Sequence, residues 1–293
     1  MITTRPDYYD KFKCIADKCT DSCCIGWEID IDPETLEIYE NESGELGEKL
    51  KKNIRDRSFL LTEDERCPFL KSDGLCELIC RKGEGFLCEI CTEHPRYYEY
   101  CGDHVDMGVG LCCEEACCLL FSELKPLTFI TEGEGELDGE ERELLELRAE
   151  LASKPGLVEA MLSDIDNSIF ELWDGFEPYD GRWTTTNAYI KDKLDTLLSL
   201  RDEFNTYLGN RMLEYNRLTL YLLHRYFMRS VYSAPSVILS GISLYIKTQY
   251  LWDLYTYHTT GKFDSADRID TAKYISKQIE YSEENIDMLL YGD

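Results

Sequence analysis

The feature that most constrains this chain is the position of its cysteines. All fourteen lie between Cys14 and Cys118, and none follows in the rest of the 293-residue sequence. The N-terminal residues show no basic region followed by an apolar one, so we expect no secretory signal and a cytoplasmic location. In a reducing compartment, thiols gathered in one segment are more typical of metal binding than of disulfides.

The densest group of thiols favours a particular kind of metal centre. Cys14, Cys19, Cys23 and Cys24 fall within one short run. Thiolate sulfur suits both zinc and iron–sulfur clusters. Paired zinc knuckles usually show two separated C-x2-C units, whereas this chain has one, Cys88 to Cys91. The spacing therefore favours an iron–sulfur cluster, with zinc as the alternative, and we expect the metal to hold this region folded.

The charge of the chain excludes one class of partner. It contains 58 acidic and 31 basic residues, for a formal net charge of -27. Such a surface repels nucleic acid and favours cationic partners, such as lysine side chains or a sulfonium, although the same charge also serves solubility. The most apolar stretches are interrupted by Arg225, Arg229 and Lys247, so we expect core helices and no membrane partner.

Local signals in the first part of the chain predict helices and two hairpins. Asp32 and Pro33 form a helix N-cap and first position. The Asp73-Gly74 pair favours a tight turn that would bring Cys67 and Cys76 close together. A second hairpin is expected from residues 97–100 and 104–109.

The composition changes after Pro126. Residues 131–141 are acidic and rich in glycine, as expected of a solvated linker. Beyond them, apolar residues recur at helical spacing, and His224 and His258 are predicted to be core or surface residues rather than metal ligands. Further helices are expected at residues 187–208, 211–232, 235–259, 266–281 and 282–290.

These signals predict a mainly α fold. We expect a cysteine-rich metal or iron–sulfur domain with short hairpins at residues 1–125. An acidic, glycine-rich linker would follow at residues 126–142, and a C-terminal helical bundle would occupy residues 143–293.

Several spaced motifs together resemble one known family. The motifs that carry the resemblance are Tyr8-x3-Phe12-x-Cys14, Cys19-x-Asp21-Ser22-Cys23-Cys24-Ile-Gly-Trp27, Cys67-Pro-Phe-Leu70, Leu75-Cys76, Cys91-x3-Pro95-Arg96 and Cys113-Glu-Glu-Ala116. Through them the chain is similar to the flagellin lysine-N-methylases, which are related to the zinc- or iron-chelating cysteine-rich domain proteins.

The resemblance implies an activity, a cofactor set and a partner. It implies a protein-lysine N-methyltransferase that modifies flagellin, or another protein with exposed lysines, using S-adenosylmethionine. It also implies an iron–sulfur cluster, expected to be of the 4Fe-4S type, with zinc as the alternative. Eight cysteines match the family positions as metal ligands: Cys14, Cys19, Cys23, Cys24, Cys67, Cys76, Cys91 and Cys113.

Methyl transfer rests on the resemblance alone, because the sequence shows neither a glycine-rich cofactor loop nor a C-x3-C-x2-C run. The catalytic residues are therefore unknown. Arg96 is a candidate anchor for a cofactor carboxylate or cluster, with a structural salt bridge as the alternative. Trp27 could shape a cofactor pocket or pack around the double cysteine. The contrasting function is a non-catalytic zinc- or iron–sulfur-binding protein with a structural or redox-sensing role.

Overall fold

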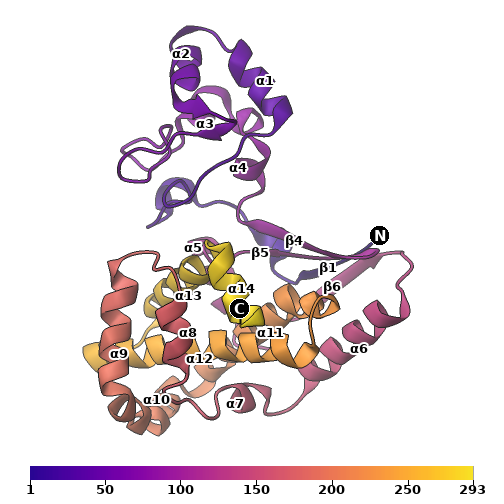
Figure 1. Ribbon diagram of the computed structural model, residues 1–293, viewed down its shortest axis with the longest axis vertical. Coiled ribbons are helices and arrows are strands. Elements are labelled where there is room, and N and C mark those ends of the chain that lie inside the picture. The colour runs from indigo at the N-terminus through magenta and orange to yellow at the C-terminus, as the bar shows by residue number, and fades with distance from the viewer. Residues whose placement is uncertain (293) are drawn as a thin grey trace. The chain divides into compact units, whose positions relative to one another are not determined.

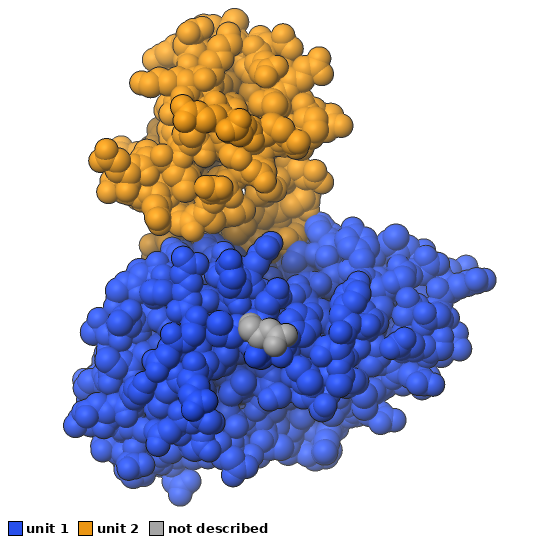
Figure 2. Space-filling model, in the orientation of Figure 1, with its two compact units in different colours: residues 1–12, 97–293 blue, residues 13–96 orange. Residues whose placement is uncertain are grey.

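The computed structural model describes residues 1–292, which form two compact units (Figure 2). Unit 2 is the continuous segment Lys13–Arg96, and unit 1 combines Met1–Phe12 with the chain from Tyr97 onward. The fold is mainly helical, as predicted. Unit 2 lies within the segment 1–125 predicted as the cysteine-rich domain, and the rest of that segment belongs to unit 1.

Unit 1 contains a four-stranded sheet with the order β4-β5-β1-β6. Its strands are β1 (Ile2–Pro6), β4 (Arg96–Cys101), β5 (His104–Val109) and β6 (Phe129–Gly133). β1 runs parallel to β5 and antiparallel to β6. The hairpin expected around Gly102 is confirmed as β4 and β5, so the N-terminal strand extends a hairpin formed far along the chain.

The segment predicted to be a linker, residues 126–142, contains β6 and the start of a helix instead. Its acidic side chains are exposed, which explains the solvated composition, while its backbone pairs with β1. Gly133 adopts a φ of +87°, and a Cβ there would collide with the carbonyl oxygen of Met1. The partner strand is distant in sequence, so local composition could not reveal the pairing.

The rest of unit 1 is helical (Figure 1). The helices are α5 (Glu114–Phe121), α6 (Gly139–Ser153), α7 (Leu157–Met161), α8 (Ile169–Gly175), α9 (Gly181–Ser199), α10 (Arg201–Leu208), α11 (Leu213–Tyr226), α12 (Pro235–Thr260), α13 (Ser265–Glu280) and α14 (Glu283–Tyr291). The last three agree closely with the predicted ranges. The predicted helix 187–208 is two helices and begins earlier, because Asp180 caps α9 by accepting a hydrogen bond from the Arg182 amide.

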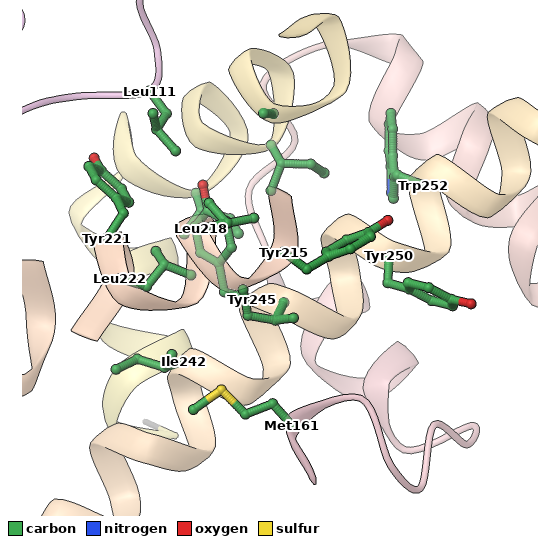
Figure 3. Packing of buried hydrophobic residues seen from close by; sticks show 14 of the residues in the cluster. Leu111, Met161, Tyr215, Leu218, Tyr221, Leu222, Ile242, Tyr245, Tyr250 and Trp252 are labelled. Carbon is green, nitrogen blue, oxygen red and sulfur yellow. The ribbon is translucent and has the colours of Figure 1, made fainter. Parts of the chain in front are cut away.

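Helix α12 is the central element of unit 1. It packs against α9, α11, α13 and α14. Tyr245, Tyr250 and Trp252 on this helix lie in the common core (Figure 3). A helix with apolar residues on most sides is expected in such a buried position. At Gly241 an added Cβ would lie 2.5 Å from the Leu289 carbonyl oxygen, so a glycine permits the close approach of α14.

Despite this apolar character, no helix among residues 1–292 combines the length and hydropathy needed to cross a bilayer. His224 is a core residue, as predicted. Its Nε2 lies 2.9 Å from the Met107 carbonyl oxygen and its Nδ1 lies 3.3 Å from the Asp106 carboxylate.

Unit 2 has its own smaller core. Its elements are α1 (Pro33–Asn41), α2 (Gly44–Asn53), β2 (Ile54–Arg55), β3 (Ser58–Phe59), α3 (Glu77–Lys82) and α4 (Glu89–Glu93). The buried side chains of Ile29, Ile31, Tyr39, Leu50 and Phe59 form the centre of this core.

Three helices of unit 1 meet at a buried ionic network. The Arg268 guanidinium donates to the Asp253 carboxylate and, at 2.9 Å, to Glu214. Asp253 also accepts hydrogen bonds of 2.6 Å from Tyr215 and from Thr271. Arg268 is 1% exposed and Asp253 is fully buried. The network therefore connects α11, α12 and α13 through charges that have no access to water.

We predict that Arg268→Ala lowers the free energy of unfolding by about 3–5 kcal/mol, because it leaves the buried Asp253 carboxylate without its cation, whereas Glu214 keeps Arg211. Lys191→Ala is the control, since Lys191 pairs with Asp174 at an exposed position and should cost less than about 1 kcal/mol. Urea denaturation followed by tryptophan fluorescence would report on unit 1, which holds Trp173, Trp183 and Trp252. Equal losses in both variants would contradict the prediction.

Candidate metal centre

Five cysteines gather in the core of unit 2. Cys67 and Cys88 are buried in the apolar core, while Cys24, Cys76 and Cys91 are partly exposed and pack against it. These five come from three separate stretches of sequence. The fold therefore converts a dispersed pattern into one local concentration of thiols.

Backbone pairing brings the first three of these thiols together. The Cys67 amide donates to the Cys24 carbonyl oxygen at 2.8 Å. Leu70 and Cys76 form an antiparallel bridge across the predicted turn, in which Gly74 has a φ of +81°. The expected proximity of the Cys67 and Cys76 segments is confirmed, and the double-cysteine segment pairs with the same hairpin.

Helix α4 supplies the other two thiols. Cys88 is its N-cap and Cys91 lies within its first turn. The Cys91 thiol donates a hydrogen bond to Cys88, which lowers the pKa of Cys88 and raises that of Cys91. One thiolate is therefore stabilised by its neighbour. The thiolate is the form of cysteine that binds metals.

The other core thiols oppose ionisation. Burial raises the pKa of Cys67 to about 11, and the nearby Cys76 and Cys88 add to the rise. Burial also raises the pKa of Cys76, with contributions from Cys23 and Cys80. These mutual effects mean that several thiolates together are disfavoured in the absence of a cation. A bound metal ion would invert this balance, since it favours deprotonated ligands.

Asp32 positions α4 beside α1. One carboxylate oxygen accepts the Thr35 amide at 2.9 Å, which caps α1 as the sequence predicts. The other oxygen accepts the Glu89 amide at 2.8 Å, at the start of α4. These hydrogen bonds lower the pKa of Asp32, led by the bond from Glu89. A single carboxylate thus connects two helix N-termini and fixes the segment that carries Cys88.

The eight cysteines predicted as ligands divide between the two units. Cys14, Cys19 and Cys23 precede α1 in unit 2 and are exposed or partly exposed, whereas Cys113 is the N-cap of α5 in unit 1. Cys88 was not among the eight. Its signal in the sequence is the single C-x2-C unit, and the structure places it at the centre of the thiol group.

Trp27 and Arg96 have distinct settings. The Trp27 indole donates to the Cys23 carbonyl oxygen at 2.7 Å, and its ring stacks on His94 with centroids 5.2 Å apart. Trp27 therefore packs around the double cysteine, in keeping with the second of its predicted roles. Arg96 is partly buried at the first position of β4, and its role as a cofactor anchor remains a prediction.

The donor set suits a soft metal ion, since thiolates are preferred by zinc and by iron–sulfur clusters. Among residues 1–292, however, no three His, Cys, Asp or Glu side chains are arranged in the geometry of a metal site. The thiols therefore fit a soft metal ion by their donor chemistry and by their common location in the core of unit 2. It extends to Cys24, Cys67, Cys76, Cys88 and Cys91.

Comparison with known proteins identifies relatives for part of the chain. No protein-family model matches, and no solved structure matches. A lysine-N-methylase of Salmonella typhimurium is 26% identical over 131 residues, covering 39% of this chain and 31% of that protein. This chain resembles the lysine-N-methylase family. A second lysine-N-methylase, from Salmonella choleraesuis, aligns with the same identity and coverage.

The same stretch also resembles the flagellar biosynthetic protein FliU of Salmonella muenchen, with 26% identity over 131 residues and 74% of that protein covered. The resemblance expected from the sequence motifs is thus confirmed. The aligned stretch spans about a third of the length of the lysine-N-methylases.

We predict that Asp32→Ala destabilises unit 2 by about 1–2 kcal/mol, because it removes an N-cap and the tie to α4. Since the pKa of Asp32 is lowered in the folded state, the contribution is complete above the unfolded pKa of about 4 and is lost as pH falls through the folded value. Amide hydrogen exchange of α1 and α4 at pH 7 would detect the change. The exposed Asp64→Ala serves as the control, and unchanged protection in Asp32→Ala would refute the prediction.

Proposed function

We propose that this protein is a protein-lysine N-methyltransferase that takes its methyl group from S-adenosylmethionine and carries an iron–sulfur cluster in unit 2. The observation that carries the proposal is the similarity to two lysine-N-methylases over 39% of this chain. The similarity to a flagellar biosynthetic protein supports flagellin as the substrate. The thiol group in unit 2 supports the cluster.

In this proposal the five core thiols hold the cluster, with Cys14, Cys19 and Cys23 available from the preceding segment. A bound cluster would supply electron transfer or a Lewis-acidic iron. The chain's own residues keep the centre in place. Asp32 fixes α4, the hydrogen bond within the Cys88–Cys91 pair favours one thiolate, and Trp27 restrains the double-cysteine segment.

The acidic surface supports a lysine-bearing substrate. A net charge of -27 attracts cationic side chains and raises the rate of encounter. Exposed charges separated by more than a Debye length, about 8 Å at physiological ionic strength, are largely screened. Substrate association should therefore weaken as salt is added.

A second candidate function is a non-catalytic zinc or iron–sulfur protein with a structural or redox-sensing role. The Cys88–Cys91 pair favours it, because a thiol bonded to a neighbouring thiolate is suited to reversible oxidation. The two candidates differ in whether the protein binds S-adenosylmethionine.

We predict that protein purified without oxygen contains iron and acid-labile sulfide. Cys24→Ser and Cys91→Ser should lose most of the iron, because both thiols pack in the unit 2 core. Cys118→Ser in α5 should retain it, since that cysteine lies in unit 1. Metal analysis, sulfide assay and absorbance would measure the outcome. Stoichiometric zinc without sulfide would replace the cluster by the zinc alternative.

We also predict methyl transfer to flagellin. Reduced holoprotein incubated with S-adenosylmethionine and flagellin should add mass in steps of about 14 Da per methyl group on lysine. The rate should fall as salt rises from low to physiological concentration. Mass spectrometry of digested flagellin would locate the modified lysines.

Arg96→Lys should slow this transfer, because lysine keeps the charge but loses the guanidinium fork. The exposed Arg55→Lys is its control. Unmodified flagellin, together with no binding of S-adenosylmethionine by cluster-loaded protein, would favour the non-catalytic function.

A further inference from the structure

A second polar site lies inside unit 1. We call it the Arg225 chamber, and define it as the Arg225–Glu280 ion pair with the tyrosines around it. Arg225 lies on α11 and Glu280 ends α13. The tyrosines come from the segment after β1, from β4, from α11 and from α12: Tyr8, Tyr97, Tyr221, Tyr226 and Tyr245. Tyr221 and Tyr245 are visible in the core (Figure 3).

The ion pair engages only some of the hydrogen-bonding atoms of Arg225 and Glu280. One terminal nitrogen of Arg225 lies 2.7 Å from Glu280 Oε2 and also donates to the Tyr221 hydroxyl at 2.7 Å. Ser276 donates to the same Glu280 oxygen at 3.0 Å. Within the described part of the chain, Arg225 Nε and Glu280 Oε1 are buried and have no hydrogen-bond partner.

Several tyrosine hydroxyl groups in the chamber are also buried without a hydrogen-bond partner in the described part of the chain. The hydroxyls of Tyr8, Tyr97, Tyr226 and Tyr245 also have no hydrogen-bond partner among residues 1–292. Tyr8 and Tyr226 are 2% exposed and Tyr245 is 1% exposed. Buried polar atoms in proteins are nearly always paired, and an unpaired one costs folding free energy. These six atoms form a set of donors and acceptors that a buried water or a bound ligand would satisfy.

Ring contacts join Arg225 to two of the tyrosines, and charge effects link Tyr8 and Tyr245 to the ion pair. The Arg225 guanidinium lies 4.3 Å from the centre of the Tyr97 ring and 5.3 Å from that of Tyr226. Burial raises the pKa of Tyr245, and the Glu280 carboxylate adds to the rise. At Tyr8 the positive charge of Arg225 opposes the effect of burial.

The unpaired atoms define the chemistry of the occupant. Arg225 Nε and the tyrosine hydroxyls can donate to an anion, whereas the Glu280 oxygen can accept from a cation. A simple cation would be repelled by Arg225, and a simple anion by Glu280. A ligand that carries both a negative and a positive group would pair the first with Arg225 and the second with Glu280.

We propose that the Arg225 chamber binds the ammonium–carboxylate end of an α-amino-acid ligand. The ligand carboxylate would pair with Arg225 and the tyrosine hydroxyls, and its ammonium group with Glu280. The Arg225 side chain is 15% exposed and that of Glu280 is 4% exposed, so Arg225 is the more accessible of the two charged groups. S-adenosylmethionine and free L-methionine both carry this end, and the first of these rests on the proposed function.

The test is titration calorimetry on the full chain, prepared without oxygen and with its metal bound. The probes are S-adenosylmethionine, L-methionine and methylthioadenosine, which lacks the amino-acid end. We expect Glu280→Gln and Tyr245→Phe each to weaken S-adenosylmethionine binding about tenfold or more, since each removes a partner of the charged end. Methylthioadenosine should bind the variants as it binds the unaltered protein.

Tyr250→Phe is the matched control, because Tyr250 is also buried on α12 but its hydroxyl bonds to Asn205 at 2.9 Å, away from the chamber. It should leave S-adenosylmethionine binding unchanged. Tyr245→Phe removes a hydroxyl that has no partner in the described chain, so it should preserve folding even if Glu280→Gln does not. Thermal unfolding of each variant checks this.

The outcomes separate the two proposals. If both variants bind S-adenosylmethionine as the unaltered protein does, the chamber is not its site, and the proposed function stands. If L-methionine binds and the variants lose it while S-adenosylmethionine does not bind, the chamber is supported and the methyl donor in the proposed function is wrong. If no probe binds the unaltered protein, or if the variants weaken methylthioadenosine equally, the chamber proposal is overturned.

Discussion

The pairing of β1 with β5 and β6 is the interaction on which the organisation of this chain depends. It places the first residues of the sequence between strands that lie more than 100 positions later. Because β1 and β4 belong to one sheet, residues 13–96 must leave that sheet and return to it. The cysteine-rich unit is therefore an insertion in the larger unit, anchored at both ends, rather than a domain at the end of a linker.

The core of unit 2 combines apolar side chains with thiols. The segment has a smaller apolar core than unit 1. Here thiols occupy positions beside Ile29, Tyr39 and Phe69 that an ordinary core would give to hydrocarbon side chains. Burial raises the pKa of Cys67 and of Cys76, and neighbouring thiols add to both rises. A bound cation would favour the thiolate forms instead.

Features with a local physical cause could be predicted from the sequence. Asp32 and Pro33 start α1, Asp73 and Gly74 turn the hairpin, and helical spacing gives α12 to within a residue. Features that depend on distant partners could not. The acidic residues of β6 look like linker because their side chains are solvated, while their backbone pairing partner lies at the other end of the domain.

In the candidate site, too, features with a local cause could be predicted and features that depend on distant residues could not. The hairpin that joins Cys67 to Cys76 was predictable from a turn, whereas the position of Cys88 in the core depends on Asp32 reaching the Glu89 amide 57 residues away. The Arg225 chamber could not be predicted from the sequence, because its members come from five separate segments that only the fold brings together.

The inserted position of unit 2 also has meaning for biosynthesis. A ribosome releases the chain from its N-terminus, and domains generally fold as units while synthesis proceeds. Residues 13–96 emerge complete before β5 and β6 exist, so β1 has no strand to pair with during that interval. The core of unit 2 can thus assemble on a chain whose sheet is still open. Closure of the larger unit then fixes both ends of a segment that has already folded.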